Sequence, residues 1–402
     1  MTDQPLVGLE ADLYAEELKR RLDALDVLCK TVEPGKRRGT NLHIHTNESF
    51  SVFRSPTEAV WQAAREGVAV FGINDHYTCA GHDEFRRACE IARLPATFSM
   101  EAIAMDREAE ADGRLTNDPG NPGRTYLCAK GVTRIPPDDS VPMQNLNRIR
   151  AALDRRHRDM SQKLREFLQE TAGLPGPDWD EVVALTPRGN VTERHIAKAA
   201  AIWVRNFAIS RGLELAEAVP RCFHVEPTGF DEVTLQNFIR SKLLKVGGPC
   251  YVEETPEAFL SIDEMRDLFL GFGAIPTYPV LANPVTDGER DIHALMDRLE
   301  SINIFALEVI PARNTKERLA EVIEAARERS WPVFNGTEHN TPSPAPLLAE
   351  LSLDPDFLPW FKSSAAVLLG HHKLVANGQP GFVGAEGKPS ISDAGVRLDH
   401  FV

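Results

Sequence analysis

Two histidines separated by one residue are the first candidates for chemistry in this chain. His43 and His45 flank Ile44 in a short apolar stretch. Alternate side chains of an extended strand share one face, so the two imidazoles would project together, about 7 Å apart at their Cα atoms, a spacing that suits one metal ion. Two half-buried structural histidines would give the same pattern, so the pair alone leaves both interpretations open.

More polar side chains stand in or just after apolar segments. Asp75 and His76 follow the apolar run 68–73. Since neighbours on a strand face opposite ways, we predict His76 as a ligand and Asp75 as the group that orients it; an ordinary loop start is the alternative. Glu101 lies within the apolar run ATFSMEAIA, where an unpaired carboxylate is costly to bury. A bound metal would explain it, and so would a salt bridge to Arg134.

Two later segments offer candidates of the same kind. His195 lies at the start of a predicted helix with Thr192 as its N-cap. The helix dipole disfavours a protonated histidine there, so a neutral, metal-bound imidazole would be the stable form. An exposed helix residue is the alternative. Glu338 and His339 follow the apolar segment WPVFNGT, and both could face inward only if the strand bends. We predict Glu338 as the ligand.

The elements that position these residues alternate between helix and strand. Ser55 and Pro56 predict the start of one helix. Strands are predicted at 68–73, 274–281, 304–310 and 332–337, with helices between them. This order predicts an α/β barrel, in which the C-terminal ends of parallel strands converge on one site. We divide the chain into an N-terminal helix within 1–38 that packs on the barrel, a barrel over 39–345 with a helical insertion at about 135–255, and a C-terminal extension over 346–402.

Composition and charge narrow the possible partners. The 402 residues carry 45 Lys and Arg against 59 Asp and Glu, a formal charge of −14, which disfavours a nucleic-acid duplex as partner but allows a local pocket for a small anion. No stretch has the roughly 18 apolar residues of a membrane helix, and the N-terminus lacks the pattern of a signal peptide. A cytoplasmic protein that acts on a small molecule is expected.

Taken in order, the motifs carry a resemblance. NLHIHTNES, GINDHYT, a glutamate on the next strand, an RHIAKA helix start and GTEHN together resemble the polymerase and histidinol phosphatase (PHP) family, particularly its small phosphoesterases with a helical insertion. The resemblance spans about 39–345. It implies a distorted (β/α)7 TIM-like barrel, up to three divalent ions and hydrolysis of phosphate esters by metal-activated water. The positions that match ligands of the family are His43, His45, His76, Glu101, His195 and Glu338.

Several positions depart from the pattern of that family. Phe50 stands in the place of an aspartate, Tyr126 and Tyr278 stand in places of histidines, and the final Asp-x-His is replaced by Glu338, His339 and Asn340. These exchanges weaken the ligand sets of a second and third ion. One divalent ion (Zn, Mn or Fe) is therefore expected, although Asn340 could donate a carbonyl oxygen to another.

The resemblance favours a phosphoesterase that acts on a small phosphorylated metabolite. Asp75 or His76 would then move protons, and Arg194, Lys198 and Arg313 are candidates to bind the phosphate, although each could equally be a solvated surface charge.

The exchanged ligands support two other possibilities. One is a mononuclear lyase, isomerase or non-phosphate hydrolase of a sugar-like or carboxylated metabolite, in which Tyr126 and Tyr278 act as phenol donors or base instead of packing in the core. The other is a barrel that binds a metabolite without turning it over.

Overall fold

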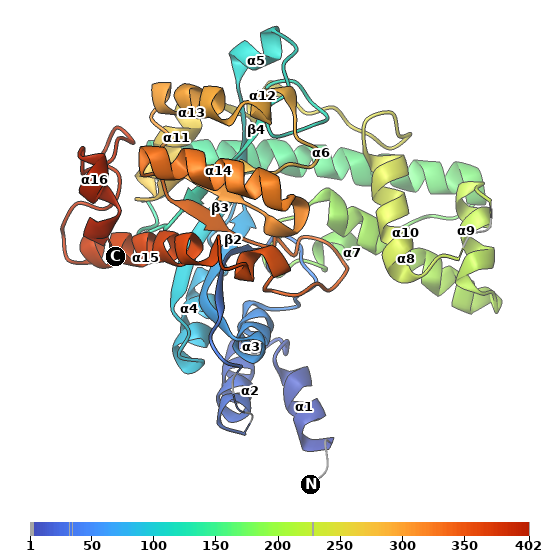
Figure 1. Ribbon diagram of the computed structural model, residues 1–402. Helices are drawn as coiled ribbons and strands as arrows, with labels where there is room; N and C mark the ends of the chain where they lie inside the picture. Colours follow the sequence, from blue (N-terminus) through green and yellow to red (C-terminus); the bar gives the residue numbers. More distant parts are fainter. Residues whose placement is uncertain (1–3, 32, 34, 227–228, 402) are drawn as a thin grey trace.

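A nearly closed barrel-shaped sheet of seven strands forms the centre of the molecule, with helices around it (Figure 1). The structure is a computed structural model that describes residues 4–31, 33, 35–226 and 229–401. In spatial order the strands are β1 (Gly39–Ile44), β2 (Val68–His76), β3 (Ala96–Met105), β4 (Arg124–Lys130), β6 (Ile275–Val280), β7 (Leu307–Val309) and β8 (Val333–Asn335), and the short β5 (Leu260–Ser261) pairs with β3. The predicted α/β fold class, a distorted TIM-like barrel, is confirmed.

The first and last strands close this barrel. Glu338 N donates a hydrogen bond to His43 O at 2.9 Å, and His45 N donates to Glu338 O at 2.7 Å. Asn335 Nδ2 donates to Thr40 O at 2.6 Å within the same seam. Because these bonds join β1 to the chain after β8, the first and last sequence motifs meet at one end of the barrel.

One strand runs against the expected direction. The alternation of helix and strand predicts a parallel sheet, but β4 is antiparallel to both β3 and β6. A parallel connection needs a crossover along the face of the sheet. Instead, the segment with α5 (Arg107–Ala111) stays at the end of β3, where Asp106 N donates to Gly123 O at 2.7 Å and the chain turns back. The reversal places Tyr126 opposite Ile103, near the carboxyl end of β3.

Helices cover the outside of the sheet and bury apolar side chains against it. They are α3 (Pro56–Glu66), α4 (His82–Ile91), α11 (Ile262–Gly271), α12 (Asp287–Arg290), α13 (Ile292–Ser301) and α14 (Lys316–Arg329), with short turns η2 (Pro256–Ala258) and η3 (Pro311–Arg313). The start predicted for α3 is confirmed, because the Ser55 side chain accepts a hydrogen bond from Glu58 N and Pro56 takes the first helical position.

The N-terminal segment forms two helices, whereas one helix within 1–38 is predicted from the sequence. They are α1 (Gln4–Asp12) and α2 (Leu18–Thr31). In the segment between α1 and α2, Ser55 Oγ donates to Leu13 O at 2.5 Å and Arg21 Nη1 donates to Ala15 O at 2.6 Å. Side chains therefore bind the carbonyl oxygens that would accept backbone hydrogen bonds in a continuous helix. An ion pair of 2.5 Å between Arg21 and Glu84 attaches α2 to α4.

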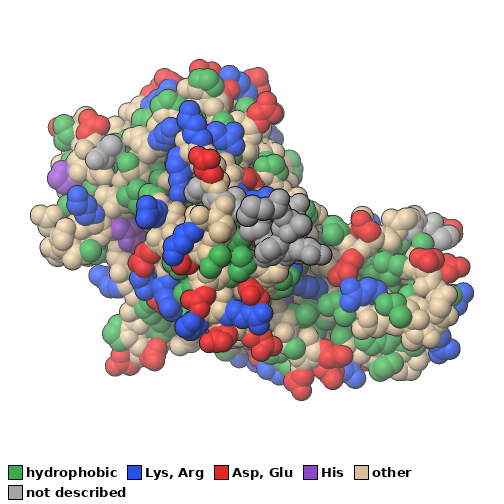
Figure 2. Space-filling model, turned by 90° about the horizontal axis from the view of Figure 1, so that it is seen from below, with side chains coloured by type: hydrophobic (Ala, Val, Ile, Leu, Met, Phe, Trp, Pro, Cys, Tyr) green, Lys and Arg blue, Asp and Glu red, His purple; other side chains and the backbone are tan. Residues whose placement is uncertain are grey.

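The helices of the predicted insertion form a lobe beside the barrel (Figures 1 and 2). They are α6 (Val141–Ala172), α7 (Trp179–Val183), α8 (Glu193–Arg211), α9 (Leu215–Phe223), α10 (Glu232–Phe238) and the π-helix η1 (Ile239–Leu244). The lobe has an apolar cluster of its own, which includes Met160, Ile196 and Leu235. It therefore adds a second wall opposite the strand ends without disturbing the barrel core.

The C-terminal extension lies against the barrel. It contains η4 (Glu350–Leu353), α15 (Leu358–Ala376), α16 (Ala394–Arg397) and η5 (Asp399–Phe401), and α15 contacts β1 and β8 at the closing seam. Among the described residues, no helix combines the length and the apolar composition that a membrane crossing requires.

Gly336, just after β8, leaves room for the first histidine of the motif. A Cβ at this position would lie 2.2 Å from His43 Cβ and 3.0 Å from His43 Cα. We expect Gly336→Ala to lower the free energy of unfolding by about 1–3 kcal/mol, because the strand or His43 must move. Urea denaturation measures the change. Gly8→Ala is the control, since no atom lies within 4 Å of the added carbon there. Equal stability of Gly336→Ala and the wild type would contradict this packing.

Candidate metal centre

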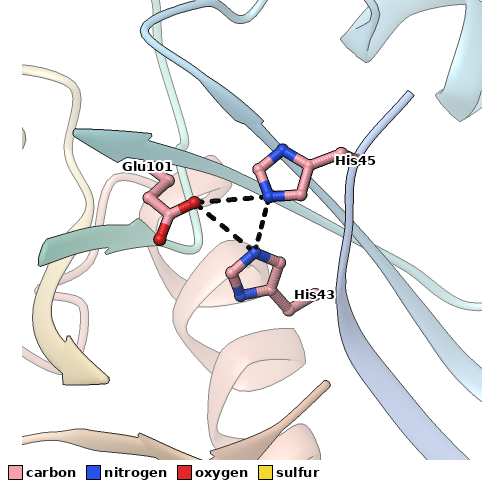
Figure 3. A group of neighbouring side chains, drawn as sticks. All are labelled: His43, His45 and Glu101. Carbon is pink, nitrogen blue, oxygen red and sulfur yellow. Dashed lines mark hydrogen bonds and ion pairs between the residues drawn. The ribbon is translucent and has the colours of Figure 1, made fainter. Parts of the chain in front are cut away.

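His43, His45 and Glu101 form a buried group at one end of the barrel (Figure 3). His43 Nε2 lies 3.1 Å from His45 Nε2, and Glu101 Oε2 lies 3.3 Å from His45 Nε2 and 3.8 Å from His43 Nε2. His43 lies at the end of β1 and His45 directly after it, and β3 supplies the carboxylate. Three residues predicted as ligands are therefore brought together by the fold.

A buried ion pair orients the first histidine. His43 Nδ1 lies 3.0 Å from Glu308 Oε2, and Lys130 Nζ lies 2.5 Å from Glu308 Oε1. Burial alone would raise the pKa of Glu308, but His43 and Lys130 outweigh it and lower this pKa to about 2. Since Glu308 is a carboxylate, Nδ1–H of His43 donates to it, so Nε2 carries the lone pair, which faces Glu101 and accepts a hydrogen bond from Asn74.

A second set of hydrogen bonds orients His45. Ser49 Oγ donates to Asp75 Oδ1 at 2.6 Å and lies 3.1 Å from His45 Nδ1. Asp75 also accepts from Thr46 N and Oγ1, at 2.7 and 2.6 Å. The serine oxygen thus accepts Nδ1–H of His45. Asp75 acts on His45 through Ser49, which corrects the prediction that it orients His76.

This arrangement fits a divalent cation. Two imidazole lone pairs and a carboxylate oxygen converge, and the Nδ1–H groups are already engaged elsewhere. The two lone pairs and the carboxylate oxygen repel one another. The hydrogen bond that Asn74 Nδ2 donates to His43 Nε2 at 2.9 Å offsets only part of this repulsion. Burial and the neighbouring His43 hold the pKa of His45 well below its ordinary value, so no proton on His45 Nε2 separates these acceptor atoms. Two nitrogens and one oxygen suit Zn, Mn or Fe.

His76 stands at the edge of the group. Its Nδ1 lies 3.1 Å from Glu101 Oε2, and its ring centre lies 4.3 Å from that of His45. Burial, followed by the charges of His45 and His43, lowers its pKa to about 3, so it is neutral near pH 7. The His76 side chain is 23% exposed, whereas those of His43 and His45 are fully buried. His76 therefore lies between the buried group and the neighbouring cavity, which it lines.

Glu338 turns inward but is paired with an arginine. The backbone bends at Glu338 and His339, whose φ angles are 64° and 57°, and His339 stacks on Phe53 instead. Arg313 donates two hydrogen bonds to the carboxylate of Glu338, one of them 2.5 Å long, and Asn340 Nδ2 donates another at 3.1 Å. Burial raises the pKa of Glu338, but Arg313 outweighs it and the net shift is downward.

His195 lies outside the group. Its Nδ1 accepts a hydrogen bond from Thr192 N at 3.0 Å, which confirms Thr192 as the N-cap, and its ring packs edge-on against Phe50. Burial lowers the pKa of His195 to about 3. Lys198 Nζ lies 6.0 Å from the centre of the Phe50 ring. Neither His195 nor Lys198 is among the described residues that line the cavity next to the group.

That cavity has a volume of about 930 Å³ and lies between the strand ends and the insertion. Its lining includes His76, Glu101, Tyr126, Arg194 and Glu338. The two tyrosines singled out from the sequence therefore differ: Tyr126 reaches the cavity, whereas Tyr278 is 2% exposed and packs in the core.

Sequence reasoning missed Glu308, Lys130 and Ser49. Glu308 lies in the apolar segment FALEVI, which is the signal that singled out Glu101, and Lys130 lies in the apolar segment LCAKGV. The same argument about buried charge would have found both residues, but it could not have paired them.

Comparison with known proteins supports the fold. No family model and no curated protein matches the chain. A solved structure from Bifidobacterium adolescentis, described provisionally as a metal-dependent phosphoesterase, matches with a TM-score of 0.55 at 20% identity, covering 83% of this chain and 98% of that one. An amidohydrolase from Chromobacterium violaceum, solved with sulfate and without metal, matches with a TM-score of 0.50 at 15% identity, covering 75% of this chain and 87% of that one. The chain shares its fold with these proteins.

Removing the carboxylate behind His43 should weaken metal binding. We expect Glu308→Gln to raise the dissociation constant of Zn²⁺ about 10–100-fold, because the tautomer and orientation of His43 are no longer fixed. Titration calorimetry measures it, with Glu324→Gln on the surface of α14 as control. The double variant Glu308→Gln/Lys130→Met avoids a buried unpaired lysine. Wild-type affinity in this folded double variant would contradict the role of Glu308.

Glu289, buried near Tyr278, should make stability depend on pH. Leu281 N donates to its Oε1 at 3.2 Å, its Oε2 has no hydrogen-bond partner among the described residues, and burial raises its pKa from 4.5 to about 7. Between these values the folded chain binds the extra proton, so stability falls as pH rises from 4.5 towards 7. We expect the free energy of unfolding of the wild type, measured with urea, to fall by up to about 3 kcal/mol between pH 5 and 7.5. Glu289→Gln should not show this decrease. Glu324→Gln should keep the wild-type slope, and an unchanged slope in Glu289→Gln would refute the assignment.

Proposed function

We propose that this chain is a metal-dependent phosphoesterase that acts on a small phosphorylated metabolite. The observation that carries the proposal is the buried group of His43, His45 and Glu101, which brings three possible ligand atoms together beside a large cavity. The fold shared with the Bifidobacterium protein, which is described as a phosphoesterase, agrees with it.

A divalent ion held by His43, His45 and Glu101 would supply hydroxide from water near neutral pH and polarise a phosphoryl oxygen. His76 lines the cavity and its side chain is 23% exposed, so its imidazole is placed to contact a molecule in the cavity and to form a hydrogen bond with it.

Arg194 is the best candidate to bind the phosphate. It lines the cavity and has no hydrogen-bond or ion-pair partner among the described residues. Burial, and then the positive charge of Arg240, lowers its pKa to about 9, so it remains a cation at pH 7. Arg313, in contrast, is already engaged by Glu338. Arg194 would therefore orient an anion towards His76 and Glu101.

A mononuclear enzyme that does not act on phosphate is the second candidate. One observation favours it: Glu338, a predicted ligand, is paired with Arg313, which leaves the group of His43, His45 and Glu101 with three ligands. Tyr126 lines the same cavity and could act as a phenol donor to a carboxylated or sugar-like molecule. The fold shared with an amidohydrolase agrees with such a hydrolase.

Metal analysis combined with phosphatase assays tests the proposal. We expect one tightly bound ion per chain and turnover of p-nitrophenyl phosphate that chelation abolishes. His45→Ala should lose the ion and at least about 100-fold in kcat/KM, since two ligand atoms cannot hold the metal in a defined geometry. His293→Ala, at an exposed position on α13, is the control. Full metal content in His45→Ala would refute the site, and one tight ion without phosphate turnover would favour the second candidate.

A further inference from the structure

A cluster of cations lines the insertion side of the cavity. Arg156 of α6, Arg240 of η1 and Lys245 surround Glu193 at the start of α8, and we call these three cations the insertion cation cluster. Arg156 Nη1 lies 3.2 Å from Glu193 Oε1, while Lys245 Nζ and Arg240 Nε lie 2.6 and 3.7 Å from Glu193 Oε2. All four residues line the cavity.

This cluster has more positive charge than its carboxylate can balance. Three cations face one glutamate, which leaves two positive charges, and Arg194 adds another next to them. Arg240 Nε is buried and has no hydrogen-bond acceptor among the described residues. A buried donor without an acceptor is costly, so a ligand that accepts from it would be stabilised.

Other carboxylates of the cavity wall do not remove this surplus. Glu254 and Asp118 both pair with Arg124, Asp154 pairs with Arg158 at 2.8 Å, and Glu48 pairs with Arg188. His157, also in the lining, is neutral near pH 7, because burial lowers its pKa to about 4. A local positive surplus in a chain of net charge −14 indicates a site for a negatively charged ligand.

The surplus and the candidate metal centre face the same space. His76 and Glu101 line the cavity on the barrel side, and the insertion cation cluster lines it on the other. Arg194, next to Glu193 at the start of α8, lines the same cavity. One molecule in the cavity could therefore contact both walls.

We infer that the substrate carries a second anionic group, a carboxylate or a phosphate, and that the insertion cation cluster binds this group while the ester phosphate lies at the candidate metal centre. The inference rests on the proposed function and names its substrate class: a small phosphate ester with two separated anionic groups. The barrel then supplies the chemistry, and the insertion selects the substrate.

The kinetic test compares probes that differ in the second anion. Fructose 1,6-bisphosphate is paired with fructose 6-phosphate, and 3-phosphoglycerate with glycerol 3-phosphate, so that two separations of charge are sampled. We expect the wild type to favour the doubly anionic probe of at least one pair about ten-fold or more in kcat/KM, the effect of one charge-assisted hydrogen bond. The variant Arg240→Gln/Lys245→Gln should lose this preference and keep its activity on the singly anionic probe.

A binding measurement keeps the test independent of turnover. We expect chelator-treated wild-type protein to bind inorganic phosphate in titration calorimetry, and the double variant to bind it about ten-fold more weakly. Arg205→Gln is the matched control, because Arg205 is an exposed cation of α8 paired with Glu232. If turnover is absent but phosphate binding depends on Arg240 and Lys245, the proposed function fails and the anion site stands. Equal phosphate binding by the folded double variant and the wild type would overturn the inference.

Discussion

The hydrogen bond between Glu308 and His43 is the interaction on which the candidate metal centre depends. It joins two fully buried side chains that are 265 residues apart in the sequence, and it decides that Nε2 of His43 is the unprotonated nitrogen. A buried carboxylate without a partner would be costly, and Lys130, also fully buried, supplies the compensating charge at 2.5 Å. The barrel core thus contains an ion pair that orients the imidazole of a candidate metal ligand.

The geometry separates chemistry from recognition. Groups that could hold a metal come from the barrel strands, where closure between β1 and β8 and the packing around Gly336 leave little freedom. Cations that could hold a substrate come mostly from the insertion, which has its own apolar core and meets the barrel across a cavity. Such a division lets one wall keep precise distances while the other adapts to the size and charge of a ligand.

Local pattern was enough to predict His43, His45 and Glu101, because strand alternation and a carboxylate inside an apolar run are signals within a few residues. Local pattern could not predict which distant side chains would meet. The direction of β4 depends on how the segment after β3 turns back, and the orientation of His195 depends on a hydrogen bond with its own N-cap. The pairing of Glu308 with Lys130 could not be predicted either, because the local sequence around two buried charges does not indicate that they are partners.

Glu338 was predicted as a metal ligand from the sequence, but in the structure it is paired with Arg313. Its carboxylate accepts two hydrogen bonds from Arg313 in a bidentate pair, an arrangement that is strong because the planar guanidinium matches the carboxylate. To bind a metal, Glu338 would have to give up this pair and leave Arg313 beside the new positive charge. A bound cation and Arg313 therefore compete for the same oxygens. If the proposed function holds, this competition would favour a single ion at His43, His45 and Glu101 over a larger cluster.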